Sequence, residues 1–129
     1  MMDIKLYQEE LMDHFKNPRN YGRLDNPDFS AEDNNPSCGD RICIDGKLLK
    51  GYLVKINFVG KGCVLSQATA SMLMELLTNK SIDYILSLTA KDVLNIVGLE
   101  LGPVRIKCAM LPLLVLKAGI NSITNKGIL

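Results

Sequence analysis

The feature that most constrains the fold is an alternation of apolar and polar residues in two consecutive segments, 41–49 and 52–60. Lys50 and Gly51 separate the segments and supply a tight turn. Two alternating segments joined by such a turn predict an antiparallel β-hairpin. The alternation also predicts that one face of the hairpin is covered and the other mostly solvated. Cys43 falls on the expected solvated face, so we expect an exposed thiol that is incidental to any site.

Helical periodicity flanks the hairpin on both sides. Apolar residues three and four positions apart predict an amphipathic helix over residues 4–16. A long polar connection follows, 17–35, in which a short strand is possible but not legible. Beyond the hairpin, Ser66 is a candidate N-cap for a helix over residues 66–79. The expected buried stripe of this helix consists of Ala68, Met72 and Leu76.

Two short helices are predicted next along the chain. Ser81 opens the first, and Thr89 opens the second with Asp92 three residues later, close to the spacing of a capping box. Gly98 ends the pair. Caps of this kind satisfy the N–H groups that a helix leaves without partners at its start.

A final helix is predicted near the end of the chain. Residues 99–104 are expected to be extended, and the helix to run from about residue 106 or 108 to residue 118. Proline disrupts a helix interior but is tolerated in the first turn, so Pro112 implies that the helix starts late or bends. The apolar run around this proline, 109–116, is too short to span a bilayer.

Together these elements predict an α+β fold, in which a small antiparallel sheet of about three strands carries helices on one face. A chain of 129 residues can bury a core without disulfides, and we expect a single domain over residues 1–129. Fifteen basic and fourteen acidic residues give a net charge of +1, which offers no field for nucleic acid. The first residues lack the basic and apolar regions of a signal peptide, so we expect a cytoplasmic protein without a membrane partner.

Four cysteines, at positions 38, 43, 63 and 108, carry the functional signal. Cys63 and Cys108 precede predicted helices, whose N-terminal N–H groups favour the thiolate that binds metals. Cys38 lies in a polar turn, and Asp40 follows two residues later, so an extended backbone would point both side chains the same way. Three thiolates and a carboxylate suit a zinc ion, and thiolates also hold iron–sulfur clusters. The sequence has no Cys-x-x-Cys pair, so these residues alone leave a shared metal site and scattered structural thiols equally open.

The motifs around the cysteines break this tie. They are residues 12–22 (Met-Asp-His-Phe-Lys-Asn-Pro-Arg-Asn-Tyr-Gly), 35–40 (Asn-Pro-Ser-Cys-Gly-Asp), 60–63 (Gly-Lys-Gly-Cys) with Ser66, Ala68 and Ser71, and 103–108 (Pro-Val-Arg-Ile-Lys-Cys). In these motifs and their order the chain resembles the IscU/SufU family of iron–sulfur cluster assembly proteins, also called the NifU N-terminal domain family. The resemblance covers nearly the full length and implies a SufE/NifU-like fold.

The resemblance also implies a function. It implies that Cys38, Asp40, Cys63 and Cys108 bind zinc or a nascent [2Fe–2S] cluster, with Asp40 as the weak oxygen ligand that eases release. A cysteine desulfurase would deliver sulfur to Cys108 if the protein behaves as IscU, and to Cys38 if it behaves as SufU. The implied protein is a scaffold that passes the cluster to acceptor proteins and is not an enzyme in the strict sense. The alternatives are a zinc-dependent sulfurtransferase that relays persulfide, as SufU does, and a structural zinc domain.

IscU-type members of the family carry a histidine immediately before the last cysteine. This chain has Lys107 at that position instead, as in SufU-type members. The short spacing between Cys63 and Cys108 is IscU-like, because SufU-type members usually hold an insertion there. A protonated lysine cannot ligate a metal. We therefore expect Lys107 to modulate the site, by keeping Cys38 or Cys108 ionised or by pairing with Asp40, or else to be a solvated surface residue.

Two further expectations concern a partner and the lone histidine. The segment from Leu101 to Arg105 resembles the IscU motif that an Hsp70-type chaperone reads, with Gly102 in place of a proline and arginine in place of a lysine. His14 is the only histidine in the chain. On a helix beside apolar neighbours, we expect it to pack or to form hydrogen bonds rather than to bind a metal.

Overall fold

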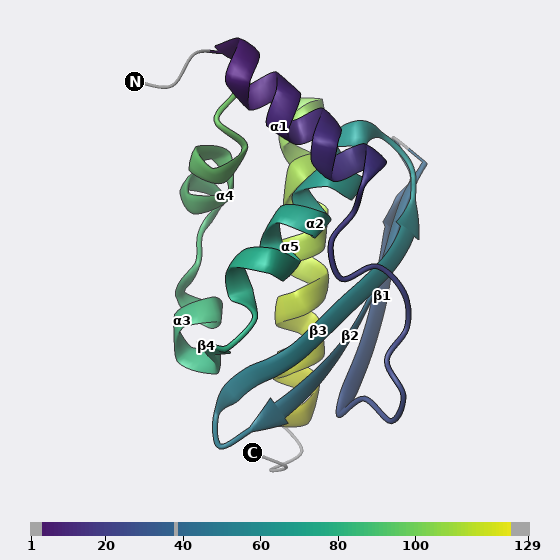
Figure 1. Cartoon of the computed structure of the whole chain (residues 1–129), viewed down its shortest axis with the longest axis vertical. Helices are drawn as coiled ribbons and strands as arrows, with labels where there is room; N and C mark the ends of the chain where they lie inside the picture. Colours follow the sequence, from purple (N-terminus) through teal and green to yellow (C-terminus); the bar gives the residue numbers. More distant parts are fainter. Residues whose placement is uncertain (1–3, 38, 125–129) are drawn as a thin grey trace.

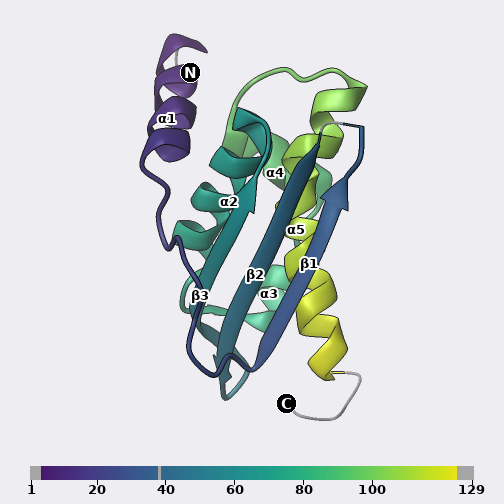
Figure 2. The same cartoon turned by 90° about the vertical axis from the view of Figure 1, so that its right-hand side faces the viewer.

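The computed structural model of the chain describes residues 4–37 and 39–124. Its elements follow one another as α1 (Ile4–Lys16), β1 (Phe29–Asn35), β2 (Asp40–Leu49), β3 (Tyr52–Lys61), α2 (Val64–Leu77), β4 (Lys80–Ser81), α3 (Ile82–Ser87), α4 (Ala90–Val97) and α5 (Pro103–Thr124) (Figure 1). The strands form one antiparallel sheet in chain order. Helices α2 and α5 lie against one face of this sheet, and α1 packs on α2 (Figure 2). The predicted α+β architecture is confirmed.

The sheet has four strands rather than about three. The polar connection contains β1, which pairs along β2 from Phe29 opposite Gly46 to Asn35 opposite Asp40. The short strand β4 pairs with the start of β3. β1 is mostly exposed and β4 has only two residues. Neither strand shows a clear alternation for that reason, and each is defined by its pairing partner.

β2 and β3 form the predicted hairpin, with Leu49 opposite Tyr52 at its end. Lys50 and Gly51 have φ angles of 52° and 83°. Two consecutive positive φ values are typical of a type I′ turn, whose twist matches that of the flanking strands. The apolar residues on one face of both strands are buried beneath the helices. The hairpin therefore forms the base on which the helical layer packs.

The expectation that Cys43 is exposed is wrong, because the side chain is only 6% exposed. The connection between α1 and β1 folds back toward the face of the sheet that was expected to be solvated. There Arg23 Nε donates a hydrogen bond to Asp45 Oδ2 at 2.7 Å, and the Leu24 backbone N–H donates to the same oxygen at 3.0 Å. Tyr21 forms a bridge with Phe58 at the edge of β3. The connection between α1 and β1 thus helps to close the face of the sheet that the alternation predicted to be mostly solvated.

Helix α2 is buried on more sides than the predicted stripe implies. It begins at Val64, with Cys63 as the N-cap residue, rather than after Ser66. Most of its side chains are buried because α2 lies between α1 and the layer formed by the sheet and α5. Leu76, expected in the buried stripe, is instead 48% exposed.

The capping signals of the two short helices are confirmed. Ser81 accepts a hydrogen bond from the Tyr84 N–H at the start of α3. Thr89 and Asp92 form a capping box at the start of α4, and Gly98 is its C-cap residue. Each cap depends only on residues close together in the sequence, so each is found at the position that the sequence predicts.

Helix α5 starts earlier and ends later than predicted. Pro103 is its first residue, where the missing N–H costs nothing. The extended segment predicted over residues 99–104 therefore ends before Pro103. Pro112 lies inside the helix, and the late start is therefore wrong. By length and composition α5 could also cross a membrane, but more than half of its apolar window is buried within the fold. It packs on β1, β2 and α2 as a core helix.

Candidate metal centre

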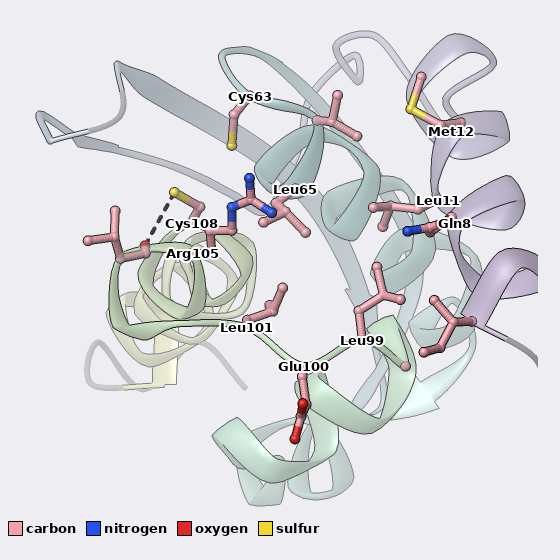
Figure 3. Close-up of a pocket in the computed structure, with 14 residues that line it drawn as sticks. Gln8, Leu11, Met12, Cys63, Leu65, Leu99, Glu100, Leu101, Arg105 and Cys108 are labelled. Atoms are coloured by element: carbon pink, nitrogen blue, oxygen red, sulfur yellow. Dashed lines mark hydrogen bonds between the residues drawn. The ribbon is translucent and has the colours of Figure 1, made fainter.

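Three predicted ligands from three separate elements meet at one end of the sheet. Asp40 begins β2, Cys63 precedes α2 and Cys108 lies in α5. Their ligand atoms all lie within 4.8 Å of one another. Asp40 and Cys108 are buried and Cys63 is half-buried. Figure 3 shows the thiols of Cys63 and Cys108 on the same side of the pocket that they help to line. Two sulfurs and one carboxylate oxygen at this separation can share one cation.

Asp40 is oriented by the backbone that follows β3. Its Oδ1 accepts a hydrogen bond from the Cys63 backbone N–H at 2.8 Å, and its Oδ2 lies 3.6 Å from the Cys63 Sγ. Gly62 permits this approach because its φ is 136° and a Cβ there would clash with the Asp40 carboxylate. One oxygen of Asp40 is thus held by the protein while the other faces a thiol.

Cys108 does not stand at a helix N-terminus, contrary to the prediction. It is the sixth residue of α5, because that helix begins at Pro103. Its thiol donates a hydrogen bond to the Val104 carbonyl at 3.5 Å (dashed in Figure 3), and Asn35 Nδ2 lies 3.9 Å from its sulfur. The helix-terminus argument for a thiolate therefore applies only to Cys63, the N-cap residue of α2.

The remaining cysteines fall outside this group in different ways. Cys38 lies outside the described residues, so its role as a ligand and sulfur acceptor stays a prediction. Cys43 is three residues beyond Asp40 along β2, which is about 10 Å at 3.3 Å per residue. Its side chain also points to the opposite face, because successive strand residues alternate. The structure separates Cys43 from the candidate centre, as expected. The burial of Cys43 was not expected.

Lys107 is exposed beside Cys108. Within residues 4–37 and 39–124, the ion pairs do not include a contact between Lys107 and Asp40. Neighbouring residues on a helix point about 100° apart, so the Lys107 side chain leaves α5 in a different direction from the thiol. Its modulating role stays a prediction.

His14 lies elsewhere, between α1 and α2. Its Nδ1 is 2.7 Å from the Ser71 hydroxyl, and its side chain is buried. Burial lowers the pKa of His14 below its usual value of 6.5, and Arg19 adds to this effect. His14 packs and forms hydrogen bonds, as predicted, and is not part of the three-residue group.

An apolar groove of about 1080 Å³ opens beside the two thiols. Helix α1 forms one wall, and the chain from Gly98 to Arg105 forms another (Figure 3). The segment proposed as a chaperone motif therefore borders the candidate centre. Apolar side chains in the wall include Leu11, Met12, Leu65, Leu99 and Leu101.

Two neighbours of the thiols were not predicted as part of the site. Asn35 approaches Cys108 from the end of β1, a strand that the sequence did not resolve. Ser66 was interpreted as a helix cap and as part of the motif around Cys63 but given no role at the site, yet its hydroxyl lies 3.9 Å from the Cys63 sulfur. The three-residue spacing of Cys63 and Ser66 across a first helical turn was the available signal.

Comparisons with known proteins identify the family of this chain. A profile of the NifU-like N terminal domain matches residues 6–128. The zinc-dependent sulfurtransferase SufU of Bacillus subtilis strain 168 is 36% identical over 132 residues, covering 89% of both chains. The iron–sulfur cluster assembly scaffold protein IscU of Escherichia coli K12 is 32% identical over 124 residues, covering 93% of this chain and 95% of that protein.

Solved structures show the same fold. A crystal structure from Fervidobacterium islandicum AW-1, described as a cluster assembly scaffold for the SUF system, superposes with a TM-score of 0.79 at 24% identity. It covers 92% of this chain and 99% of that one. The chain therefore belongs to the family of the NifU-like N-terminal domain, in which its relatives carry the names IscU and SufU.

Proposed function

We propose that this chain is an iron–sulfur cluster assembly scaffold. It accepts sulfur from a cysteine desulfurase, holds iron and sulfide as a labile [2Fe–2S] cluster, and passes this cargo to acceptor proteins. The observation that carries the proposal is the meeting of Asp40, Cys63 and Cys108 within 4.8 Å. Soft thiolates suit iron–sulfur clusters, and the family membership supports the same activity.

The donor set accounts for binding and release. Thiols must lose their protons to bind a metal. The Cys63 Sγ lies 3.6 Å from Asp40 Oδ2, so a cation bound between these two atoms would replace the proton through which the thiol can donate to the carboxylate. Cys63 and Cys108 would then hold the cargo through sulfur, while Asp40 would offer a harder oxygen ligand that iron leaves more readily. Cys38 is the predicted further thiolate.

Sulfur transfer would proceed at Cys108 or at Cys38. The acceptor thiolate attacks the outer sulfur of the donor's persulfide, the donor S–S bond breaks, and the donor cysteine leaves as a thiolate. A reductant must then supply two electrons to release sulfide. The groove that Cys108 helps to line would receive the partner segment that carries such a persulfide. An Hsp70-type chaperone that reads the segment from Leu101 to Arg105 would contact the same groove.

The second candidate function is a zinc-dependent sulfurtransferase. Lys107 in place of a histidine favours it, and so does the 36% identity to a SufU of that description. In that case Asp40 and the thiolates would hold zinc, and the chain would relay persulfide rather than build a cluster. We place either activity in the cytoplasm.

One reconstitution separates the two proposals. The metal-free protein is incubated with a cysteine desulfurase, cysteine, a thiol reductant and ferrous iron, and its visible spectrum and metal content are recorded. A scaffold develops cluster absorption with bound iron and sulfide. Tight zinc and stimulated desulfurase turnover without any cluster absorption would contradict the scaffold and support the sulfurtransferase.

A matched pair of cysteine variants serves as control. Cys63→Ala removes a member of the candidate centre, and we expect it to lose the cluster. Cys43→Ala changes a buried thiol on the other face of the sheet, and we expect it to assemble the cluster as the parent does. Equal losses in both variants would mean that the cluster is not held at this centre.

A further inference from the structure

Ser66 lies in the first turn of α2, directly above the candidate ligand Cys63. Its side chain is fully buried. The hydroxyl donates a hydrogen bond to the Cys63 carbonyl at 3.2 Å and lies 3.9 Å from the Cys63 sulfur. The Ser66 hydroxyl therefore lies near two groups of the same residue, the carbonyl to which it donates and the sulfur.

Gln67 restricts where that proton can go. Its Nε2 donates to the Ser66 Oγ at 3.0 Å and also reaches the Arg41 carbonyl at 3.5 Å. A hydroxyl has one proton to donate. Because an amide N–H already points at the Ser66 oxygen, the Ser66 proton is directed away from Gln67 and toward Cys63.

The charge on the sulfur decides between the two acceptors. A Cys63 thiol that carries its proton is itself a donor, to Asp40 Oδ2 at 3.6 Å and to the Ser66 oxygen at 3.9 Å. Once the sulfur has lost its proton it can only accept, and hydrogen bonds to an ionised acceptor are about twice as strong as neutral ones. The Ser66 proton then has a better acceptor in the sulfur than in the carbonyl.

We infer that Ser66, oriented by Gln67, is a positioning residue that donates a hydrogen bond to the Cys63 thiolate when the centre holds a metal ion. Such outer partners fix a ligand's direction and its electron density, and their loss typically weakens metal binding about 10–100-fold. The inference rests on the proposed function only in requiring that Cys63 binds metal as a thiolate.

The test uses cobalt(II) and zinc rather than cluster assembly. Cobalt(II) reports on its sulfur ligands through thiolate-to-metal charge-transfer bands. We expect Ser66→Ala to weaken the binding of both metals about 10–100-fold. The charge-transfer bands should move to lower energy, because a thiolate without its hydrogen bond is more electron-rich. Ser66→Thr, which keeps a hydroxyl, should restore the band position.

A double-mutant cycle shows whether Gln67 acts through Ser66. Gln67→Met keeps the side-chain length and removes the amide donor, and we expect a smaller shift in the same direction. Combined with Ser66→Ala it should add nothing to that change, because the two residues form one chain of hydrogen bonds. Ser71→Ala, another fully buried serine of α2 that contacts His14 instead, is the control and should leave the cobalt spectrum unchanged.

The outcomes distinguish this inference from the proposed function. Parental metal affinity and band positions in Ser66→Ala, or in Gln67→Met if Ser66→Ala fails to fold, would overturn the inference. So would additive effects in the double variant. A parent that binds cobalt through thiolates but never assembles a cluster would overturn the scaffold proposal and leave this inference standing.

Discussion

Asp40 is the residue whose two oxygens do different things. Its Oδ1 accepts a hydrogen bond from the Cys63 backbone N–H, and its Oδ2 faces the Cys63 thiol. A carboxylate in this position is both a candidate ligand and the support of the turn that carries Cys63. A substitution at Asp40 can therefore affect both the candidate metal ligand and the turn. Asparagine and alanine substitutions separate these two effects.

Asp40→Asn keeps an oxygen for the Cys63 N–H and removes the anionic ligand, whereas Asp40→Ala removes both. We expect the metal-free alanine variant to unfold with a free energy about 1–2 kcal/mol below that of the asparagine variant, because a buried N–H loses its acceptor. Urea denaturation with a chelator measures this difference. Equal free energies of unfolding would show that the hydrogen bond to Cys63 does not support the turn.

His14 makes folding stability depend on pH. Its pKa in the folded protein is lowered by burial and by Arg19, against opposing effects of Glu75, Glu10 and Asp13. The unfolded chain therefore takes up the proton first. The contribution of His14 to the free energy of unfolding is fully present above pH 6.5, the usual pKa of the group. It is lost as the pH falls below 6.5 toward the lowered pKa of the folded protein.

Urea denaturation at a series of pH values tests this linkage. The parent should lose stability as pH falls from 6.5, above the range in which most carboxylates titrate. His14→Asn should show a flatter dependence in that interval, whatever its absolute stability. A parallel decline in both proteins would assign the dependence to other groups.

At the scale of elements, the sequence predicts those that local signals define and does not predict those that depend on distant parts of the chain. The hairpin followed from alternation and two turn residues, and α3 and α4 from their caps. β1 was illegible because its partner β2, rather than its own pattern, defines it. Two prolines could each begin the last helix, and only the packing of α5 on β1 and β2 shows that Pro103 is the one that does.

The connection between α1 and β1 is tied to the sheet through Asp45. Burial alone would raise the pKa of this carboxyl, but hydrogen bonds from Arg23, Ser30 and the Leu24 N–H outweigh it and lower the pKa. The connection accordingly lies near Cys43, because Arg23 is close enough to interact with it electrostatically. Loss of the anion should loosen this cover.

Asp45→Asn should therefore make Cys43 react faster with iodoacetamide. Mass spectrometry of peptides measures alkylation at Cys43 in variant and parent, and Cys63 provides an internal reference on the far side of the sheet. Unchanged alkylation of Cys43 would mean that the strands themselves, rather than the connection, bury the thiol.

At the scale of the whole molecule, the candidate centre joins parts that are distant in sequence. The sequence supplied the ligand types, through the motifs, but not their separation, which depends on how β2, α2 and α5 pack. Its largest error at the site concerned Cys108, because the start of α5 could not be placed without the sheet.

Metal binding should consequently stabilise the entire fold. Zinc at one hundred times its dissociation constant adds about 2.7 kcal/mol to the free energy of unfolding when only the folded chain binds it. We expect a rise in the thermal midpoint with zinc that a chelator reverses, and a much smaller rise in Cys63→Ala. An equal rise in that variant would place the zinc elsewhere.

The position of Cys108 on the last helix has a consequence for the order in which the protein is made. A ribosome releases α5 only after the sheet and the other helices have emerged, and α5 also supplies the buried face that covers β1 and β2. A chain in which α5 has not yet packed thus lacks both its third candidate ligand and much of its core. A metal ion that needs all three candidate ligands would therefore bind only chains whose core has formed.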